Sequence, residues 1–220
     1  PVDPFGAVEE GLPRELIYLR ASDGAISSGV LIRPESSTSK ICAYFMHPRG
    51  AYSRHYLGPL LYARGMPFFG HDSRYLNNDM DCLHELLLLD IAAGMRRLRE
   101  LGFDQIVLVG NSGGGSLFSY YQAQASAAPE ERFAASPAGD RVDLPDEEMP
   151  QAALFVSLAS HLGEGYILQN MLDPSVVDEH EPDSHDPDLD MYNPANGHKP
   201  WPEATHYEPD WVAHYREAQA

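Results

Sequence analysis

The chain has 220 residues, of which 43% are hydrophobic and 10% aromatic, and it carries a formal net charge of −18 at pH 7. This length and composition favour a globular protein with one main domain and a core of useful size. The acidic charge argues against nucleic acid and anionic membranes as partners, since both would repel it, and no apolar run approaches the roughly 20 residues of a membrane span.

The first part of the chain predicts an arm, a hairpin and a buried strand. Residues 1–14 are rich in proline and glycine and are typical of an N-terminal arm. Two strand-like runs, 15–22 and 25–34, flank Asp23-Gly24, a dipeptide that favours a tight hairpin turn. Residues 40–46 then form a short apolar run between turn residues, which predicts a buried strand.

Strand patterns and helix patterns then alternate as far as residue 126. Further strands are expected at 66–70 and 106–109, and helices at 54–64, 82–101 and 117–125. For the longest helix, Asp81 is the expected N-cap and Gly102 the expected stop. Alternation of this kind predicts a mostly parallel α/β sheet with crossover helices on both of its faces.

The pattern changes after the last of these helices. Residues 127–150 are rich in Ala, Pro and acids and predict a surface excursion, whereas 152–157 is another apolar strand. Residues 160–220 contain many prolines and acids and no convincing strand, although 211–218 has a helical pattern. We therefore expect a core at 1–159 and a cap- or lid-like segment at 160–220.

The two cysteines bear on the compartment. Cys42 falls in a predicted strand and Cys82 at a helix start. The favoured interpretation is that both thiols are reduced and that the protein is cytoplasmic, and the alternative is a single disulfide.

Acidic residues crowd the segment 178–190, which also contains His180 and His185. Hard cations bind clustered carboxylates, so this segment raises the question of a metal site. The spacing follows no regular ligand pattern, and the cysteines are too far apart in the sequence for a zinc motif. A solvated acidic surface is therefore favoured, and we expect neither a metal nor a cofactor.

The most informative motif is the glycine-rich stretch 110–115. It follows the apolar strand at 106–109 and precedes a helical pattern, and its first five residues match G-x-S-x-G with Ser112 at the centre. A phosphate loop of the Walker type would need a lysine after the last glycine, and a dinucleotide fingerprint would need G-x-G-x-x-G; the chain has neither here. A strand, a tight turn and a helix around one serine predict a nucleophile held at positive φ.

With this motif, the chain resembles the α/β-hydrolase superfamily, and most closely an esterase-like bacterial branch of serine hydrolases. The resemblance covers about residues 15–160 and includes the hairpin, residues 47–50 after the first buried strand, and the serine motif. The stretches 74–79 and 172–179 are also similar to that branch. The resemblance implies an α/β-hydrolase sheet of eight strands, with helices on both faces and a cap region after the sixth strand.

The resemblance also implies roles for individual residues. Ser112 would attack a carbonyl carbon and form an acyl-enzyme. The backbone N–H of Gly113 would be one oxyanion donor, and the N–H of Arg49 the second, with Gly50 as the alternative. Pocket positions implied by their place at strand ends are His47, His71, Asn111 and His161.

The histidine and the acid of a triad are not evident in the sequence. His161 follows the strand at 152–157, and Glu164 and Asp173 come soon after it, but in the family the acid and the histidine follow later strands. We therefore expect the last strands, with the acid and the histidine, to lie downstream of Ala220. The missing part would be further sequence downstream or a separate C-terminal fragment, and a homo-oligomer is the other arrangement considered.

These observations predict a serine hydrolase that cleaves a carboxylic ester of small or medium size. The alternative is a binding or scaffold protein that has the α/β-hydrolase fold without catalysis, because a fold by itself does not determine function.

Overall fold

The computed structural model describes residues 11–78, 80–181 and 183–220. Most of the predicted N-terminal arm and Asp79 lie outside the described residues. The chain divides into two compact units, Pro1–His161 and Leu162–Ala220. The first unit contains the sheet and the serine motif.

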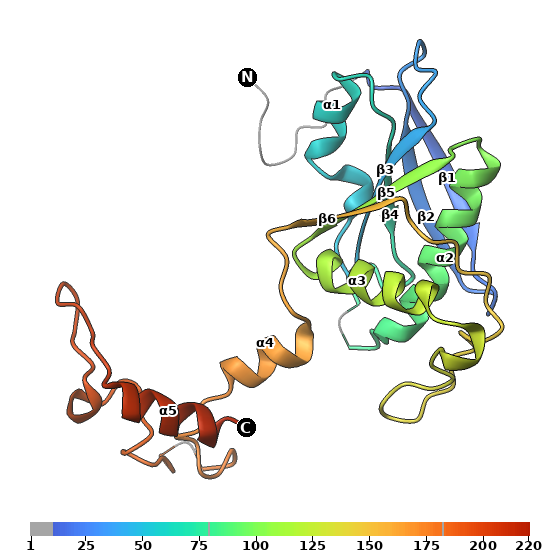
Figure 1. The fold of residues 1–220 in the computed structure, drawn as a ribbon. Coiled ribbons are helices and arrows are strands. Elements are labelled where there is room, and N and C mark those ends of the chain that lie inside the picture. The colour runs from blue at the N-terminus through green and yellow to red at the C-terminus, as the bar shows by residue number, and fades with distance from the viewer. Residues whose placement is uncertain (1–10, 79, 182) are drawn as a thin grey trace. The chain divides into compact units, whose positions relative to one another are not determined.

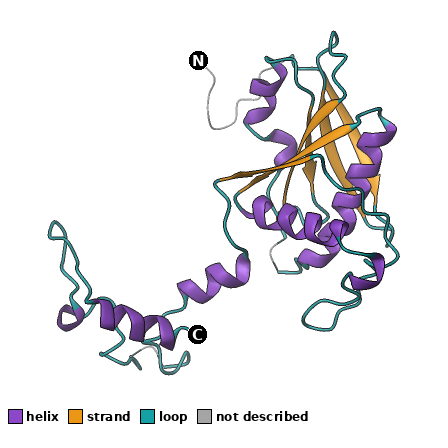
Figure 2. Ribbon diagram, in the orientation of Figure 1, coloured by secondary structure: helices purple, strands orange, loops and turns teal. Residues whose placement is uncertain are grey.

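The sheet of the first unit has six strands in the order β1-β2-β4-β3-β5-β6 (Figures 1 and 2). Their bounds are β1 Arg14–Arg20, β2 Ile26–Ile32, β3 Ile41–His47, β4 Phe68–Asp72, β5 Gln105–Asn111 and β6 Leu154–Leu158. The pairs β1–β2 and β2–β4 are antiparallel, and β4–β3, β3–β5 and β5–β6 are parallel. This arrangement confirms the predicted fold class, a mostly parallel α/β sheet that opens with an antiparallel hairpin. The described residues contain six strands of the sheet, not eight.

Five α-helices and three short 3₁₀ helices accompany these strands in the described residues. The α-helices are α1 Leu57–Tyr62, α2 His84–Glu100, α3 Gly113–Ser126, α4 Glu164–Met171 and α5 Pro209–Ala218. The 3₁₀ helices are η1 Tyr52–Arg54, η2 Pro129–Glu131 and η3 Pro194–Asn196.

The two faces of the sheet carry separate cores. Because side chains alternate along a strand, Tyr44 and Met46 point to the face that α2 and α3 cover, while Phe45 points to the opposite face. The face that α2 and α3 cover contains the larger cluster, which includes the fully buried Phe118 of α3. Leu61 of α1 packs over the other face. The continuous apolar run of β3 reflects burial on both sides, as expected for an interior parallel strand.

Two local expectations were wrong. Asp81 does not cap α2: the N-cap is Leu83, without a side-chain cap. The Asp81 carboxylate instead accepts a hydrogen bond of 3.0 Å from the Asn78 amide in the preceding turn. The segment 127–150 is also more than a surface excursion, because it returns to the core and buries three apolar side chains, those of Val142, Leu144 and Met149. The sequence did not predict this burial, because a few apolar residues among many acidic ones form no periodic pattern.

Strand β6 lies at one edge of the sheet and pairs with β5 alone among the described strands. Its Leu154 and Val156 side chains are exposed. An apolar edge strand is a surface on which another strand can pair. That a further segment lies beside β6 stays a prediction.

The second unit, residues 162–220, contains α4, η3 and α5, and no strand is assigned in its described residues. Tyr207 and Trp211 stack with ring centroids 4.8 Å apart, and the Trp211 indole donates a hydrogen bond to the Asp188 carbonyl. Gln219 after α5 donates to the carbonyl of Leu172. The described part of this unit is therefore held together by side-chain contacts of this kind and not by a sheet.

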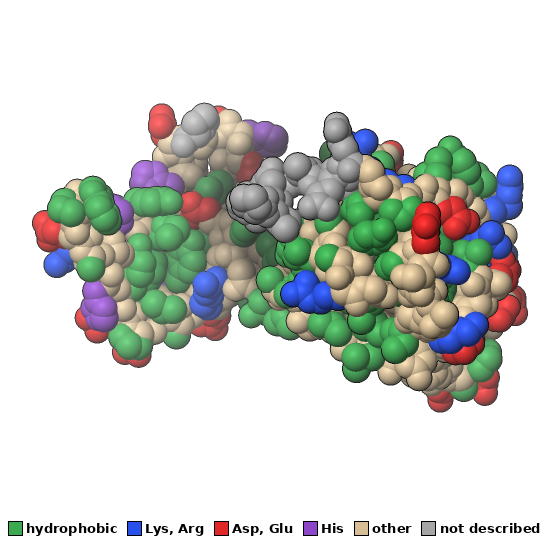
Figure 3. All heavy atoms as spheres, turned by 90° about the horizontal axis from the view of Figure 1, so that it is seen from above, with side chains coloured by type: hydrophobic (Ala, Val, Ile, Leu, Met, Phe, Trp, Pro, Cys, Tyr) green, Lys and Arg blue, Asp and Glu red, His purple; other side chains and the backbone are tan. Residues whose placement is uncertain are grey.

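The charge of the chain is visible on its surface. On the face that Figure 3 shows, acidic side chains lie on the surface of each unit, and exposed hydrophobic side chains lie among the polar ones. Of the helices that the structure describes, none has both the length and the apolar character that crossing a lipid bilayer requires.

Candidate active site

Ser112 occupies the turn between β5 and α3. Strand β5 ends at Asn111, Ser112 has φ 53° and ψ −128°, and α3 begins at Gly113. A non-glycine residue at positive φ is strained by roughly 1–3 kcal/mol, and such strain persists only where the surrounding structure enforces it. The predicted positive φ is confirmed, and the turn leaves the Ser112 side chain exposed.

The glycines around Ser112 are required by close backbone approaches. A Cβ on Gly110 would collide with the Cα of Gly115, and one on Gly114 would collide with the carbonyl oxygen of Met46. A Cβ on Gly115 would overlap the Ser160 side chain. The G-x-S-x-G spacing is therefore explained by packing of the turn against itself and against the end of β3.

The start of α3 presents a backbone donor beside the serine. Among the described residues, the N–H of Gly113 has no hydrogen-bond acceptor. The first N–H groups of a helix have no partner within the helix, and the positive end of the helix dipole lies at the same place. That this N–H stabilises an oxyanion on a substrate beside Ser112 stays a prediction for Gly113.

The loop after β3 differs from the expectation. The backbone N–H groups of Arg49 and Gly50 both donate to Nδ1 of His47, over 3.2 and 3.0 Å. The prediction that the Arg49 N–H points at an empty position beside Ser112 is therefore wrong in this structure. These bonds span two and three residues, so the loop that contains Pro48 folds back onto the ring that it follows.

Two imidazole rings lie beside Gly113. A Cβ on this glycine would be 3.0 Å from Nε2 of His47 and 3.3 Å from Nε2 of His161. His47 ends β3, and His161 follows β6, so the two rings come from strand ends on either side of β5. Parallel strands bring their carboxyl ends to one edge of the sheet, which explains why residues so far apart in the sequence meet here.

Tyr52 connects the His47 loop to the serine turn. Its ring stacks on that of His47, with centroids 5.2 Å apart and planes 25° apart. Its hydroxyl donates to the carbonyl oxygen of Asn111 and to Asn111 Oδ1, over 3.0 and 3.1 Å. The Asn111 amide also donates to the carbonyl of Leu158 over 3.0 Å. Asn111 is therefore a brace beneath the turn, and its polar atoms are committed to the protein and not to a pocket as predicted.

Sequence reasoning missed several residues of this site. Besides Tyr52, Ser160 donates from Oγ to the carbonyl of Gly110 over 2.8 Å, and Ala159 has φ 45°. Neither residue belongs to a motif, so their roles depend on contacts across the fold. A serine that follows a strand end and faces a glycine in another strand gives no signal in a single sequence.

His71 is not a pocket residue. Its side chain is completely buried, with Nδ1 2.7 Å from the Tyr44 hydroxyl and Nε2 2.8 Å from Ser27 Oγ. The pocket role predicted from its place at the end of β4 is therefore wrong, because this side chain points into the core. Burial lowers the pKa of His71 from 6.5 to about 3, and the neighbouring Asp72 opposes that shift.

The buried His71 should make the stability of the protein depend on pH. Between about pH 6.5 and pH 3, the unfolded chain binds a proton on this ring and the folded chain does not. Stability should therefore be complete above pH 6.5 and should fall, by up to about 1.4 kcal/mol per pH unit, as the pH drops through this window. Urea unfolding of the wild type and of His71→Gln at several pH values measures the effect. The variant should show a smaller slope of unfolding free energy against pH, and equal slopes would contradict the prediction.

Ser112 Oγ makes no hydrogen bond to any other described residue. The acids considered as triad members, Glu164 and Asp173, belong to the 162–220 unit. Asp173 Oδ1 accepts hydrogen bonds from the backbone N–H and the hydroxyl of Ser175, over 3.0 and 2.7 Å. Its carboxylate is thus occupied within its own turn.

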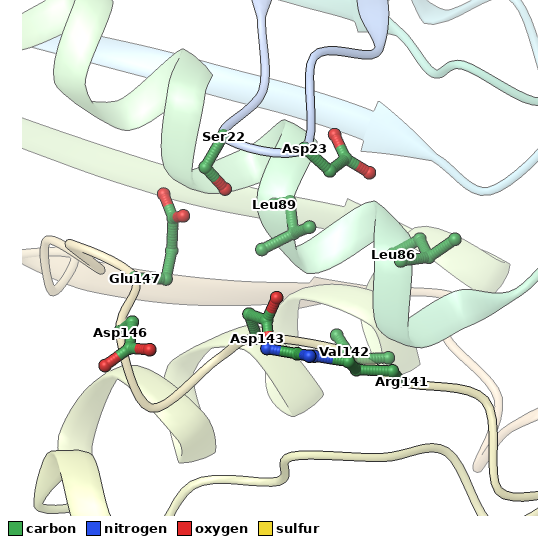
Figure 4. A pocket seen from close by; sticks show the side chains of 9 residues that line it. All are labelled: Ser22, Asp23, Leu86, Leu89, Arg141, Val142, Asp143, Asp146 and Glu147. Atoms are coloured by element: carbon green, nitrogen blue, oxygen red, sulfur yellow. The ribbon is translucent and has the colours of Figure 1, made fainter.

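Other candidate sites are weaker. No group of three or more His, Cys, Asp or Glu residues in the described part of the chain could hold a metal ion, including those near His180 and His185. Cys42 and Cys82 do not form a disulfide with each other. A pocket of about 160 Å³ in the first unit is lined by Asp23, Asp143 and Glu147, among others (Figure 4). These three carboxylates already pair with arginines, and none of the residues around Ser112 lines the pocket.

Comparison with known proteins gives distant matches only. No protein-family model matches the chain, and no curated protein matches it. Among solved structures, esterase Est22 is 24% identical, covers 51% of this chain and 39% of its own, and has a TM-score of 0.42. An esterase of Pyrococcus furiosus, PF2001, is 19% identical, with 49% and 43% covered and a TM-score of 0.41. Prolyl oligopeptidase B from Galerina marginata is 12% identical, with 51% and 18% covered and a TM-score of 0.43. The chain thus spans less than half the length of each of these proteins.

Proposed function

We propose that this chain, with its α/β-hydrolase sheet, is a serine hydrolase that forms an acyl-enzyme on Ser112. The observation that supports this most strongly is the turn itself. An exposed serine is held at φ 53° between β5 and α3, next to a backbone N–H that has no acceptor among the described residues. Strain at an exposed polar residue is costly, and a nucleophile that must stand out from the sheet accounts for it.

The proposed reaction proceeds in two halves. Ser112 Oγ attacks the carbonyl carbon of the substrate while a base removes its proton, and the carbonyl oxygen becomes an oxyanion that the Gly113 N–H and the α3 dipole stabilise. Collapse of this intermediate expels the alcohol and leaves an ester on Ser112. Water then attacks the acyl-enzyme, and the acid is released.

His161 is the proposed proton acceptor. Its Nε2 lies beside Gly113 on the β6 side, and the ring is partly exposed. In an unliganded structure, hydrogen bonds between nucleophile and base are often long or absent and tighten only when substrate binds. The absence of a hydrogen bond on Ser112 Oγ is therefore compatible with this role.

The proposed substrate is a carboxylic ester of small or medium size. This class follows from the resemblance of stretches 74–79, 110–115 and 172–179 to esterase-like hydrolases. An exposed serine places few steric limits on the alcohol, which favours simple activated esters as the first substrates to test.

A second function deserves a test because of one observation. Among the described residues, Ser112 Oγ has no hydrogen-bond partner, which also suits a binding or scaffold protein that has the fold without catalysis. The two functions differ in whether Ser112 is nucleophilic.

A fluorophosphonate probe distinguishes these functions. The probe should label the wild-type protein stoichiometrically, since an activated serine attacks phosphorus as it attacks a carbonyl carbon. Peptide mass spectrometry should place the label on Ser112. Heat-unfolded protein is the control and should not react. A folded protein that remains unlabelled would exclude the hydrolase and favour the scaffold.

A further inference from the structure

The backbone amides of the loop after β3 donate within the loop, and we therefore ask whether another group of this loop could contact a substrate. The N–H groups of Arg49 and Gly50 point at Nδ1 of His47. A nitrogen that accepts hydrogen bonds must carry a lone pair and no proton. In the neutral ring, the proton of His47 is therefore on Nε2.

Both other protonation states of His47 are disfavoured by this loop. A ring with its proton on Nδ1, or an imidazolium with protons on both nitrogens, would set an N–H against two backbone N–H groups. His47 is thus held as a donor through Nε2 and is a poor general base, because a base needs its lone pair on the nitrogen that faces the serine.

The donor nitrogen lies at the serine turn. Nε2 of His47 is 3.0 Å from the position that a Cβ on Gly113 would occupy, so it lies beside the residue whose own N–H has no acceptor among the described residues. We infer that His47 is a catalytic residue whose Nε2–H donates to the oxyanion together with the N–H of Gly113. This inference rests on the proposed hydrolase function and replaces the Arg49 amide as the second donor.

The surroundings of His47 suit a fixed donor. Tyr52 stacks on the ring, and its hydroxyl ties the same loop to Asn111, the residue before the nucleophile. Pro48 is buried, and its carbonyl accepts a hydrogen bond of 2.5 Å from Ser73 Oγ. Two amides that donate to Nδ1 also polarise the ring, which makes the opposite Nε2–H a stronger donor. A donor that is already oriented stabilises a developing charge without reorganisation.

Two substitutions separate the donor role from the structural role. In His47→Asn, the short amide reaches the Nδ1 position, where its oxygen can accept the two backbone N–H groups, but the donor at Nε2 is lost. In His47→Gln, the longer amide can place an N–H near the Nε2 position. With p-nitrophenyl acetate, His47→Asn should lower kcat by about 10²-fold with little change in KM, since one oxyanion donor is worth about that much. His47→Gln should recover at least about tenfold of the loss. His214→Asn, at an exposed histidine of the other unit, is the matched control.

The shape of the pH–rate profile and the affinity for a trifluoromethyl ketone complete the kinetic test. If His47 is a donor and not the base, the fall of kcat/KM at acidic pH should remain in His47→Gln. The affinity for the ketone, which forms an oxyanion on Ser112, should fall in parallel with kcat/KM across the variants. Unchanged kcat in His47→Asn would overturn the inference. Equal losses in both variants together with loss of the acidic limb would also overturn it, by making His47 the base.

A measurement on the wild type does not depend on activity. Nitrogen-15 NMR of labelled protein should show a pyridine-type Nδ1 and a pyrrole-type Nε2 for His47, with the resonance assigned through the His47→Gln spectrum. A pyrrole-type Nδ1 would overturn the inference even if the variants were too unstable to assay. Failure of the proposed function is a different result, because it would appear as a wild type that neither reacts with the fluorophosphonate nor hydrolyses the ester.

Discussion

Replacing Ser112 with alanine is expected to lower kcat for p-nitrophenyl acetate by at least about 10⁴-fold, a loss typical of removing the nucleophile from a serine hydrolase. The attacking atom disappears, and the remaining turn can only position water. The fold should persist, because the exposed Ser112 side chain makes no hydrogen bond to another described residue. Alanine at φ 53° keeps the strain of serine, so we expect little change in thermal stability.

Ser116 is the matched control for this substitution. It lies one turn into α3, where its Oγ donates to the carbonyl of Gly113 over 3.0 Å and its side chain is only partly buried. Ser116→Ala should keep kcat within a few-fold of the wild type and should still react with the fluorophosphonate. Near wild-type turnover in Ser112→Ala, or loss of labelling in Ser116→Ala alone, would contradict the assignment of the nucleophile.

Breaking the ion pair between Arg74 and Asp90 is expected to lower the free energy of unfolding of the first unit by about 3–5 kcal/mol. Asp90 of α2 is completely buried, and Arg74 is 9% exposed. The carboxylate accepts from the Arg74 backbone N–H at 3.0 Å and from its Nε and Nη2 at 2.9 and 2.7 Å. Removing the carboxylate in Asp90→Ala would leave the guanidinium buried, with Asp23 as its remaining carboxylate partner among the described residues. Urea unfolding measures the loss.

The same pair should matter for the active site. Arg74 lies in the loop after β4, and two groups of that loop hold the His47 segment. Ser73 Oγ donates to the Pro48 carbonyl, and the Asn77 N–H donates to the Arg49 carbonyl over 3.0 Å. We therefore expect Asp90→Ala to lower kcat as well as stability.

A surface pair provides the control for Arg74 and Asp90. Arg97 and Glu100 are 40% and 64% exposed and lie one turn apart on α2. Such a pair contributes about 0–1 kcal/mol, so Glu100→Ala should be nearly neutral. The Arg74→Met and Asp90→Leu double variant should be more stable than either single variant, because no charge is then left buried. Equal losses of unfolding free energy in Asp90→Ala and Glu100→Ala would contradict this prediction, because the buried pair would then contribute no more than the exposed one.

The local pattern of the sequence determined much of the fold. The Asp23-Gly24 turn between two strand-like runs predicted the β1–β2 hairpin, and the apolar run at 40–46 predicted β3. The helices at 82–101 and 211–218 were predicted within about two residues, with Pro209 at the start of α5. These signals are local, because a turn, a cap or an apolar period involves residues that are neighbours in the chain.

The backbone conformation of Ser112 could be predicted for the same reason. It depends on a strand, a glycine-flanked turn and a helix that follow one another within residues 105–126, and these are local in the sequence. The collisions that exclude side chains at Gly110 and Gly114 also arise largely within or beside this turn.

Only the tertiary structure decided what surrounds the serine. His47 and His161 are separated by more than half of the chain, and they meet at Gly113 because β3 and β6 both neighbour β5. Whether Arg49 offers its N–H to a substrate depends on the direction in which a proline-containing loop folds, and here it folds back onto His47. His71, equally polar and also at a strand end, points into the core instead. Strand order and the direction of a side chain are set by packing between distant segments, and a single sequence carries no local record of either.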